Sequence, residues 1–121
     1  MLSRTMAVVI ALCALPLPAG AKVKAEKGFA SWYGHDEEGR RTASGEIMDS
    51  KRLTAAHPSL PFGSIVQVTN QRNGRTVLVR INDRGPHKPN RIIDLTPVAA
   101  AQLGMQRRGL APVTIRPAPF E

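Results

Sequence analysis

The feature that most constrains the fold is a pair of β-branched runs in the stretch SIVQVTNQRNGRTVLVRIND, residues 64–83. Residues 65–69 and 76–82 are rich in Val, Ile and Thr, and the Asn73-Gly74 dipeptide between them tolerates positive φ in a tight turn. The pattern predicts an antiparallel hairpin. Because side chains alternate along a strand, the second run places Asp83 at its end, on the same face as the aliphatic residues that point into the core.

The rest of the chain predicts more short strands and one small helix. Thr96 can cap a helix that has Pro97 at its first position, runs through VAAAQL and closes at Gly104. The further strands are expected in GFASWYG (residues 28–34), RIIDL (91–95) and APVTIRP (111–117). Many short strands with no βαβ alternation indicate a mainly β fold, a small closed or partly closed barrel.

The first twenty-one residues are typical of a secretory signal peptide. Arg4 supplies the positive charge, residues 6–17 form an apolar stretch too short for a good membrane span, and the small residues of AGA precede a cleavage site after Ala21. An uncleaved anchor helix is the alternative, which Pro16 and Pro18 disfavour because proline breaks a helix.

This leader divides the chain into a signal (1–21), a charged linker (22–27), one domain (28–116) and a short tail (117–121). Cys13, the single cysteine, follows Leu12 rather than a small residue, so the sequence does not favour lipidation. The expected mature protein contains no thiol, and about a hundred residues suffice for one domain with a modest core.

The chain is strongly basic, with 17 Lys and Arg against 9 Asp and Glu and a formal net charge of +8. Removing Arg4 with the signal leaves 16 basic residues and a charge of +7. Such a charge favours a polyanionic partner. For an exported, periplasmic or secreted protein this points to the cell wall, its attached polymers or lipid headgroups, and not to nucleic acid.

Two aspartates interrupt apolar or basic surroundings in VRINDRGPHKPNRIIDL, residues 79–95. Asp83 ends a strand before a Gly-Pro turn that could open a groove, and its alternative role is to cap that turn. Asp94 lies between Ile93 and Leu95, where an ionisable group needs a partner. An ion pair with Arg91 or Arg84 is the alternative to a catalytic role.

Five blocks of the chain together resemble the rare lipoprotein A (RlpA-like) family of septal lytic transglycosylases. They are ASWYG, GRRTASGE, LTAAHPSLPFGSIVQVTN, NGRTVLVRINDRGP and RIIDLTPVAAAQLG, and the resemblance runs from about Gly28 to Ile115. It implies a six-stranded double-psi β-barrel with one or two short helices. The chain is also distantly similar to expansins. Many family members carry a lipobox cysteine and a C-terminal peptidoglycan-binding repeat, and because neither is convincing in these 121 residues, we expect the resemblance to cover the catalytic barrel alone.

The resemblance implies cleavage of the β-1,4 bond between N-acetylmuramic acid and N-acetylglucosamine, leaving a 1,6-anhydro end. A lytic transglycosylase needs one group that first donates and later accepts a proton, because the 6-hydroxyl of muramic acid is the nucleophile. Asp83 is our first candidate, with Asp94 as the alternative that the expansin likeness favours. By family resemblance, Glu46 is a further site carboxylate and His57 orients or tunes a carboxylate.

Substrate contacts are expected from aromatic and polar side chains near these carboxylates. Trp32 and Tyr33 alternate in direction, so at most one packs inward while the other could stack on a sugar. The remaining candidates are Ser44, Asn82 and Arg84, the last suited to bidentate contact with a carboxylate.

We expect no cofactor and no metal, since His35, His57 and His87 lack ligand spacing. The expected partners are peptidoglycan glycan strands and possibly cell-division or cell-wall proteins, with the protein itself a monomer. Two rival functions stay open. One is a non-catalytic, expansin-like wall-binding or wall-loosening module. The other is an inverting hydrolase that uses Glu46 and Asp83, for which the carboxyl groups must lie about 6.5 to 9.5 Å apart.

Overall fold

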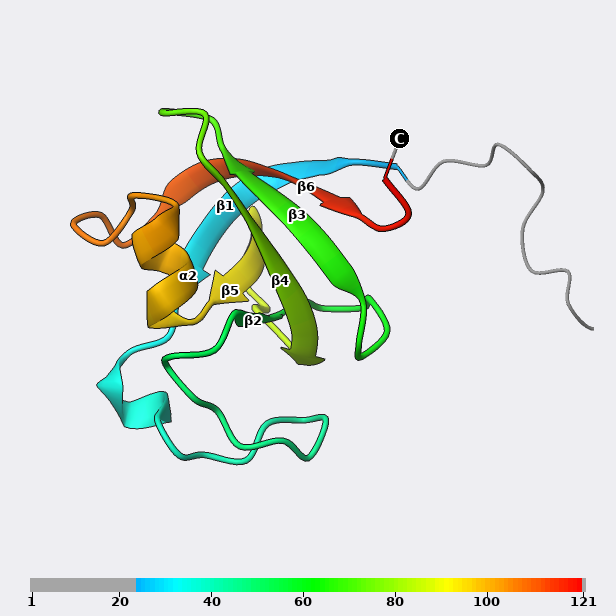
Figure 1. Cartoon of the computed structure of the whole chain (residues 1–121), viewed down its shortest axis with the longest axis vertical. Coiled ribbons are helices and arrows are strands. Elements are labelled where there is room, and N and C mark those ends of the chain that lie inside the picture. Colours follow the sequence, from blue (N-terminus) through cyan, green and yellow to red (C-terminus); the bar gives the residue numbers. More distant parts are fainter. Residues whose placement is uncertain (1–23, 121) are drawn as a thin grey trace, which may run out of the picture.

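The computed structural model describes residues 24–120, so the expected signal peptide and Cys13 lie outside the described residues. Six strands close into a barrel in the order β1-β5-β2-β4-β3-β6 (Figure 1). Their bounds are β1 Glu26–Trp32, β2 Thr54–Ala56, β3 Ile65–Asn70, β4 Thr76–Asp83, β5 Arg91–Leu95 and β6 Ala111–Pro117. The prediction of a mainly β, six-stranded barrel with a short helix is confirmed.

The β3–β4 hairpin forms as predicted, with Val68 opposite Val77 in an antiparallel pair. Of the Asn73-Gly74 pair, only Gly74 takes a positive φ, 75°. Val66 and Val68 on β3 and Val77, Val79 and Ile81 on β4 are buried in alternation, as the period of two requires. They join the inward residues of β1, β5 and β6 in one core.

Two parallel pairings distinguish the barrel from a simple meander. β1 runs parallel to β5, and β2 runs parallel to β4. The three-residue strand β2 was not predicted, because TAA carries no β-branched run or alternation. β1 begins at Glu26, two residues before the start expected at Gly28.

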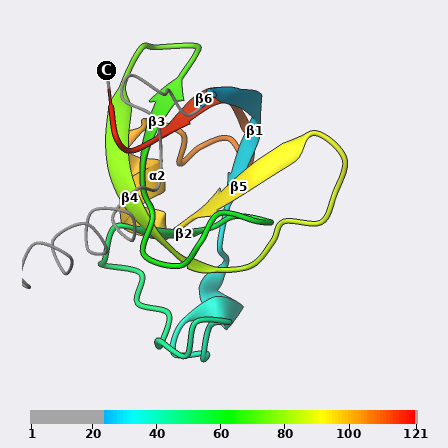
Figure 2. The ribbon, with the colours of Figure 1, turned by 90° about the vertical axis from the view of Figure 1, so that its right-hand side faces the viewer.

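The long connection between β1 and β2 lies beyond one end of the barrel, below the strands in Figures 1 and 2. It begins with a single 3-10 turn, η1 (His35–Glu37). An antiparallel bridge between Arg41 and Ile47 closes the rest of it on itself. The connection is ordered by its own hydrogen bonds although it has no hydrophobic period.

The helix α2 (Pro97–Gln102) begins at the predicted proline. Thr96 occupies the N-cap position, but its hydroxyl donates to the Arg52 carbonyl (2.7 Å) instead of capping the helix. Ala99 and Ala100 face the core. No helix in residues 24–120 is long and apolar enough to cross a membrane.

Candidate active site

The strand register brings Asp83 and Asp94 to the same end of the barrel. β2 lies between β4 and β5, and its last residue, Ala56, pairs with Asp83 on one side and Asp94 on the other. Since neighbouring strands are about 4.8 Å apart, the two aspartate backbones lie on the order of 10 Å apart. Two residues that are eleven positions apart in the sequence thus lie on either side of Ala56, at the same end of the barrel.

Asp83 uses both carboxyl oxygens as hydrogen-bond acceptors. The Tyr33 hydroxyl donates to Oδ2 (2.8 Å), and the backbone N–H groups of Ala43 (2.9 Å) and Arg84 (2.8 Å) donate to Oδ1. The bond from Arg84 is the turn-capping contact that was one reading of this residue. The contact with Ala43 also ties the β1–β2 connection to the end of β4.

Asp94 has different surroundings. Ser31, its register partner on β1, donates a hydrogen bond to Oδ1. Burial raises the pKa of the Asp94 carboxyl, although the Ser31 hydrogen bond and the charge of Arg91 oppose the shift. The carboxyl therefore holds a proton to higher pH than an ordinary aspartate, which is what a general acid requires.

A groove of about 340 Å³ opens over Asp94. A second, more apolar hollow of about 440 Å³ shares Trp32, Tyr33 and Gly34 with it and extends to Gln106. Burial, followed by the hydrogen bond to Asp83, raises the pKa of the Tyr33 phenol. Tyr33 therefore stays neutral and acts as a donor. The groove at Asp94 is lined by Ser31, Trp32, Tyr33, Gly34, Glu37, Pro86, His87, Lys88, Arg91 and Asp94.

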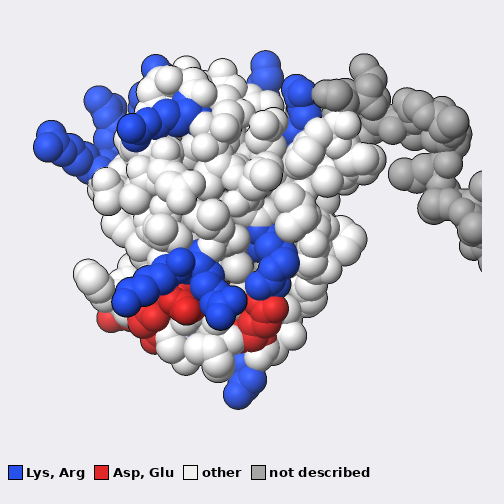
Figure 3. Space-filling view, in the orientation of Figure 1, with Lys and Arg blue, Asp and Glu red and all other residues white. Residues whose placement is uncertain are grey.

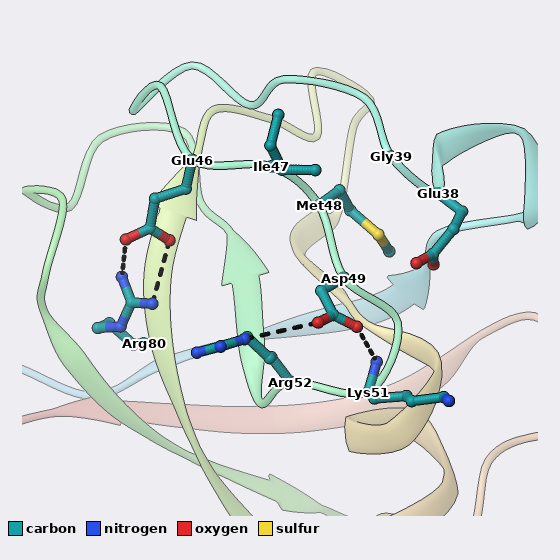
Figure 4. A pocket seen from close by; sticks show the side chains of 9 residues that line it. All are labelled: Glu38, Gly39, Glu46, Ile47, Met48, Asp49, Lys51, Arg52 and Arg80. Atoms are coloured by element: carbon teal, nitrogen blue, oxygen red, sulfur yellow. Dashed lines mark hydrogen bonds and ion pairs between the residues drawn. The ribbon is translucent and has the colours of Figure 1, made fainter.

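Glu46, in the connection between β1 and β2, binds outward side chains of β4 and does not line this groove. Its carboxylate accepts two hydrogen bonds from the Arg80 guanidinium (2.8 and 3.0 Å) and one from the Asn82 amide (3.0 Å). Arg80, and then Asn82, lower the pKa of this exposed carboxyl. Glu46 faces a separate cavity of about 650 Å³, with Asp49 and Arg52 alongside (Figure 4).

Ser44 and Asn82 join the loop to the barrel. The Ser44 backbone N–H donates to the Asn82 carbonyl (3.2 Å), and the Ser44 hydroxyl accepts from the Glu46 backbone N–H (3.3 Å). Asn82 is buried, and its Oδ1 has no hydrogen-bond partner among the described residues. These contacts position the loop that contributes Ala43 to Asp83.

His57 is buried, and its ring does not contact either aspartate. Nδ1 accepts the backbone N–H groups of Ser59 (3.0 Å) and Leu60 (3.1 Å), so Nε2 carries the proton toward Glu26 Oε1, 2.9 Å away. Its backbone N–H donates to the Asp83 carbonyl (3.2 Å). The residue thus holds the end of β4 through its backbone.

Arg84 is also engaged within the protein. Its guanidinium lies 4.1 Å from the centre of the Phe62 ring and donates to the His57 carbonyl (3.3 Å). The expected alternative of an ion pair between Asp94 and Arg84 is not what the structure contains, since the hydrogen-bond partner of Asp94 is Ser31.

The structure thus brings together Asp83, Asp94, Trp32 and Tyr33, and places Glu46 and His57 in the surrounding framework. Ser31 and Glu37, which line the groove, were missed. Alternation in GFASWYG put Ser31 on the same face as Tyr33, but only the β1–β5 register pairs it with Asp94. Among the residues described, no three His, Cys, Asp or Glu side chains are grouped as a metal site requires.

Comparison with known proteins gives a consistent result. Residues 25–115 match the family model described as "Lytic transglycolase". The "Probable endolytic peptidoglycan transglycosylase RlpA" of Treponema pallidum (strain Nichols) is 50% identical over 100 residues, which are 83% of this chain and 31% of that protein. The chain therefore spans about a third of the length of this curated relative.

Two solved structures share the fold. The Streptomyces papain inhibitor superposes with a TM-score of 0.64 at 26% identity, over 78% of this chain and 94% of the inhibitor. The apo expansin of Clavibacter michiganensis superposes with a TM-score of 0.62 at 20% identity, over 81% of this chain and 52% of the expansin, a likeness of fold alone. The family match and the closed barrel agree with the resemblance found in the sequence, and the chain belongs to the lytic transglycosylase family of double-psi β-barrels.

Proposed function

We propose that the protein is an endolytic peptidoglycan lytic transglycosylase that cleaves the β-1,4 bond between N-acetylmuramic acid and N-acetylglucosamine. Membership of the family and the name of the Treponema relative support this activity. The observation that carries the proposal is the position of Asp94, whose carboxyl group has a raised pKa and lines a groove beside Trp32. A second carboxyl group, that of Asp83, lies at the same end of the barrel.

The chemistry requires a proton for the leaving oxygen, because an alkoxide is a poor leaving group at neutral pH. We assign this proton to Asp94. Asp94 donates it to the glycosidic oxygen as the bond from the anomeric carbon to that oxygen breaks. The 6-hydroxyl of the same muramic acid then attacks the anomeric carbon, and its proton returns to Asp94. No water is consumed, so the product carries a 1,6-anhydro ring and the enzyme is regenerated.

Asp83 has the complementary role of a fixed anion near the reacting carbon. The sequence suggested it as the first candidate for the acid. Its three donors favour a different role, because both of its oxygens already accept hydrogen bonds. A carboxylate held in this way stabilises the positive charge that develops on the sugar as the bond breaks. Tyr33 is then a positioning residue that orients Asp83.

The remaining residues bind the substrate or position the site and take no part in the proton transfer. Trp32 borders both hollows and is the best-placed side chain for stacking on a sugar ring. Lys88 and Arg91 line the groove at Asp94 and can bind the lactyl carboxylate of muramic acid. We assign positioning roles to Glu46, His57, Ser44, Asn82 and Arg84, which hold the loop and the end of β4 in place.

The proposed substrate lies outside the cytoplasmic membrane, so the activity also requires export. The signal peptide predicted in residues 1–21 would provide it. Sequencing of the mature N-terminus tests this expectation, with Lys22 as the expected first residue and a lipidated Cys13 as the contrary result. A monomeric state and an association with cell-division or cell-wall proteins stay predictions.

Mass spectrometry of purified glycan strands after incubation with the protein tests the proposed reaction. Anhydro-muramic acid ends are the expected product. New reducing ends would replace the proposal with a hydrolase, and strands that are bound but unchanged in length would replace it with an expansin-like binding module. The variant Asp94→Asn should give almost no anhydro product, and Asp49→Asn is its matched control, since it makes the same chemical change beside the other cavity and should leave the product yield unaltered.

A further inference from the structure

The basic charge of the chain is unevenly distributed. No Asp or Glu occurs in residues 50–82 or in residues 95–120, whereas these two segments contain eight Lys and Arg residues. In the view of Figure 3, acidic atoms appear only in the lower part of the molecule, and the upper part shows basic atoms without them. This basic end carries the β3–β4 turn and the loop between α2 and β6 (Figure 1).

Four exposed arginines gather on these two connections and are called the arginine cluster below: Arg72, Arg75, Arg107 and Arg108. The turn and the loop contact each other. Arg72 Nη1 donates to the Leu110 carbonyl (3.3 Å), and a Cβ on Gly104 would lie 2.6 Å from Arg75 Nη1. The guanidinium of Arg75 therefore lies directly over Gly104.

The backbone beneath the cluster is rigid. The side-chain amides of Asn70 (2.9 Å) and Asn73 (3.0 Å), on the hairpin, both donate to the Leu103 carbonyl at the end of α2. The Gln71 backbone N–H donates to the Pro112 carbonyl (2.8 Å). The turn that carries Arg72 and Arg75 is thus joined by hydrogen bonds to the segment that carries Arg107 and Arg108, and no salt bridge between described residues involves any of the four.

This surface is continuous with the candidate active site. Gln106, next to Arg107 in the loop, lines the hollow that contains Trp32. The Trp32 indole N–H donates to the carbonyl of Arg108 (3.4 Å). A strand that leaves the groove past Trp32 therefore meets the loop that carries two of the four arginines.

We propose that the arginine cluster is a second binding surface for the glycan strand, which it contacts through carboxylate groups repeated along the strand beyond the cleavage point. Guanidinium groups suit this ligand because they bind carboxylates bidentately. The identity of the strand rests on the proposed function, whereas the existence of a polyanion-binding surface does not. An anionic bilayer is the less suitable partner, because the exposed side chains around the cluster, Gln71, Asn73 and Gln106, are polar and offer no apolar group for insertion.

The test compares the wild type with a variant in which Arg72, Arg107 and Arg108 are each replaced by Gln. Arg75 is kept because it packs on Gly104. For long glycan strands we expect KM and the dissociation constant to rise roughly tenfold or more, with kcat unchanged, and the salt dependence of binding to weaken. A short fragment that fills only the groove should be bound and cleaved as by the wild type.

The matched control removes the same charge elsewhere, by replacing the exposed Lys24, Lys27 and Arg116 with Gln. It should bind long strands within about threefold of the wild type, since the interaction depends on position and not on net charge alone. Circular dichroism and thermal unfolding of both variants verify that each barrel is folded.

Chemical amidation of the strand carboxylates identifies the ligand group. Amidated strands should bind the wild type at least as weakly as unmodified strands bind the cluster variant, because amidation also removes the carboxylate proposed to contact Lys88 and Arg91. The cluster substitutions should not weaken the binding of amidated strands further. Equal binding of long strands by the wild type and the cluster variant overturns the inference. So does cluster-dependent binding of polyphosphate or of anionic lipid vesicles with no effect of amidation. If binding depends on the cluster but no strand is ever cleaved, the proposed reaction fails and the surface remains.

Discussion

Two regions of the molecule, the groove at Asp94 and the outer face of β4 that binds Glu46, give their carboxyl groups opposite properties. At the groove, Asp94 is half-buried beside Ser31, and burial raises its pKa. On the outer wall, Glu46 is exposed and bound by Arg80 and Asn82, which lower its pKa. Both residues were sequence candidates for catalysis, yet only Asp94 faces the groove in a form that can keep a proton. The difference shows that the surroundings, and not the residue type, select the acid.

The largest expected effect is on cleavage by the Asp94→Asn variant. Asparagine keeps the shape of the side chain and can still accept the Ser31 hydrogen bond, but it has no proton to transfer. We expect cleavage to fall by about a hundred- to ten-thousandfold while the barrel stays folded. Quantifying anhydro ends by mass spectrometry measures this loss. A variant with a near-normal product yield would show that Asp94 is not the proton donor.

Asp83→Asn should also reduce cleavage strongly, by about a hundredfold or more, because an amide cannot stabilise positive charge on the sugar. Unlike Asp94→Asn, it should also lower the free energy of unfolding, by about 1–3 kcal/mol, since Asp83 accepts three hydrogen bonds. Urea denaturation measures this change. Tyr33→Phe, which removes one of the three donors, should reproduce part of both effects. If only Asp83→Asn were inactive, the acid would be Asp83.

Glu46→Gln should have a smaller effect on cleavage, roughly tenfold or less, because Glu46 acts by holding the loop and lies outside the groove. Its stability should change by less than about 1 kcal/mol, since exposed ion pairs contribute little. Initial rates on glycan strands and a thermal melt measure both quantities. A loss of activity as large as that of Asp94→Asn would place Glu46 in the chemical step.

The smallest effect is on how stability depends on pH, where Asp94 and Glu46 should contribute with opposite sign. The folded protein raises the pKa of Asp94, so folding favours its protonated form, and its contribution is lost as pH rises above the ordinary carboxyl pKa through the raised value. The folded protein lowers the pKa of Glu46, so that contribution is present above the ordinary value and is lost as pH falls through the lowered one.

Urea titrations at several pH values compare the two variants. As pH rises toward neutral, the free energy of unfolding of Asp94→Asn should fall less than that of the wild type. At neutral pH this variant should be at least as stable as the wild type. This expectation differs from the one that an ion pair with a buried arginine would give, since removing the partner of a buried charge destabilises. As pH falls into the acid range, the free energy of unfolding of Glu46→Gln should fall less than that of the wild type. Identical pH profiles for the two variants would contradict the comparison.

Local pattern was sufficient for most elements of the fold. The hairpin of β3 and β4, the bounds of β5 and β6 and the start of α2 agree with the sequence prediction, because alternation, turn residues and a helix-initiating proline act within a few residues. Strand β2 was missed, because its pairing with β4 and β5 comes from distant partners and TAA has no signal of its own.

For the candidate site, the sequence by itself determined which residues carry chemistry, and the tertiary structure decided what each can do. Asp83 and Asp94 were recognisable because carboxyl groups are rare in so basic a chain and interrupt apolar runs. Their common location depends on Ala56, which pairs with both, and their difference depends on Tyr33 and Ser31, which bind one each. Hydrogen bonding and desolvation depend on atoms a few ångströms away in space, and closure of the barrel brings those atoms from strands that are far apart in the sequence.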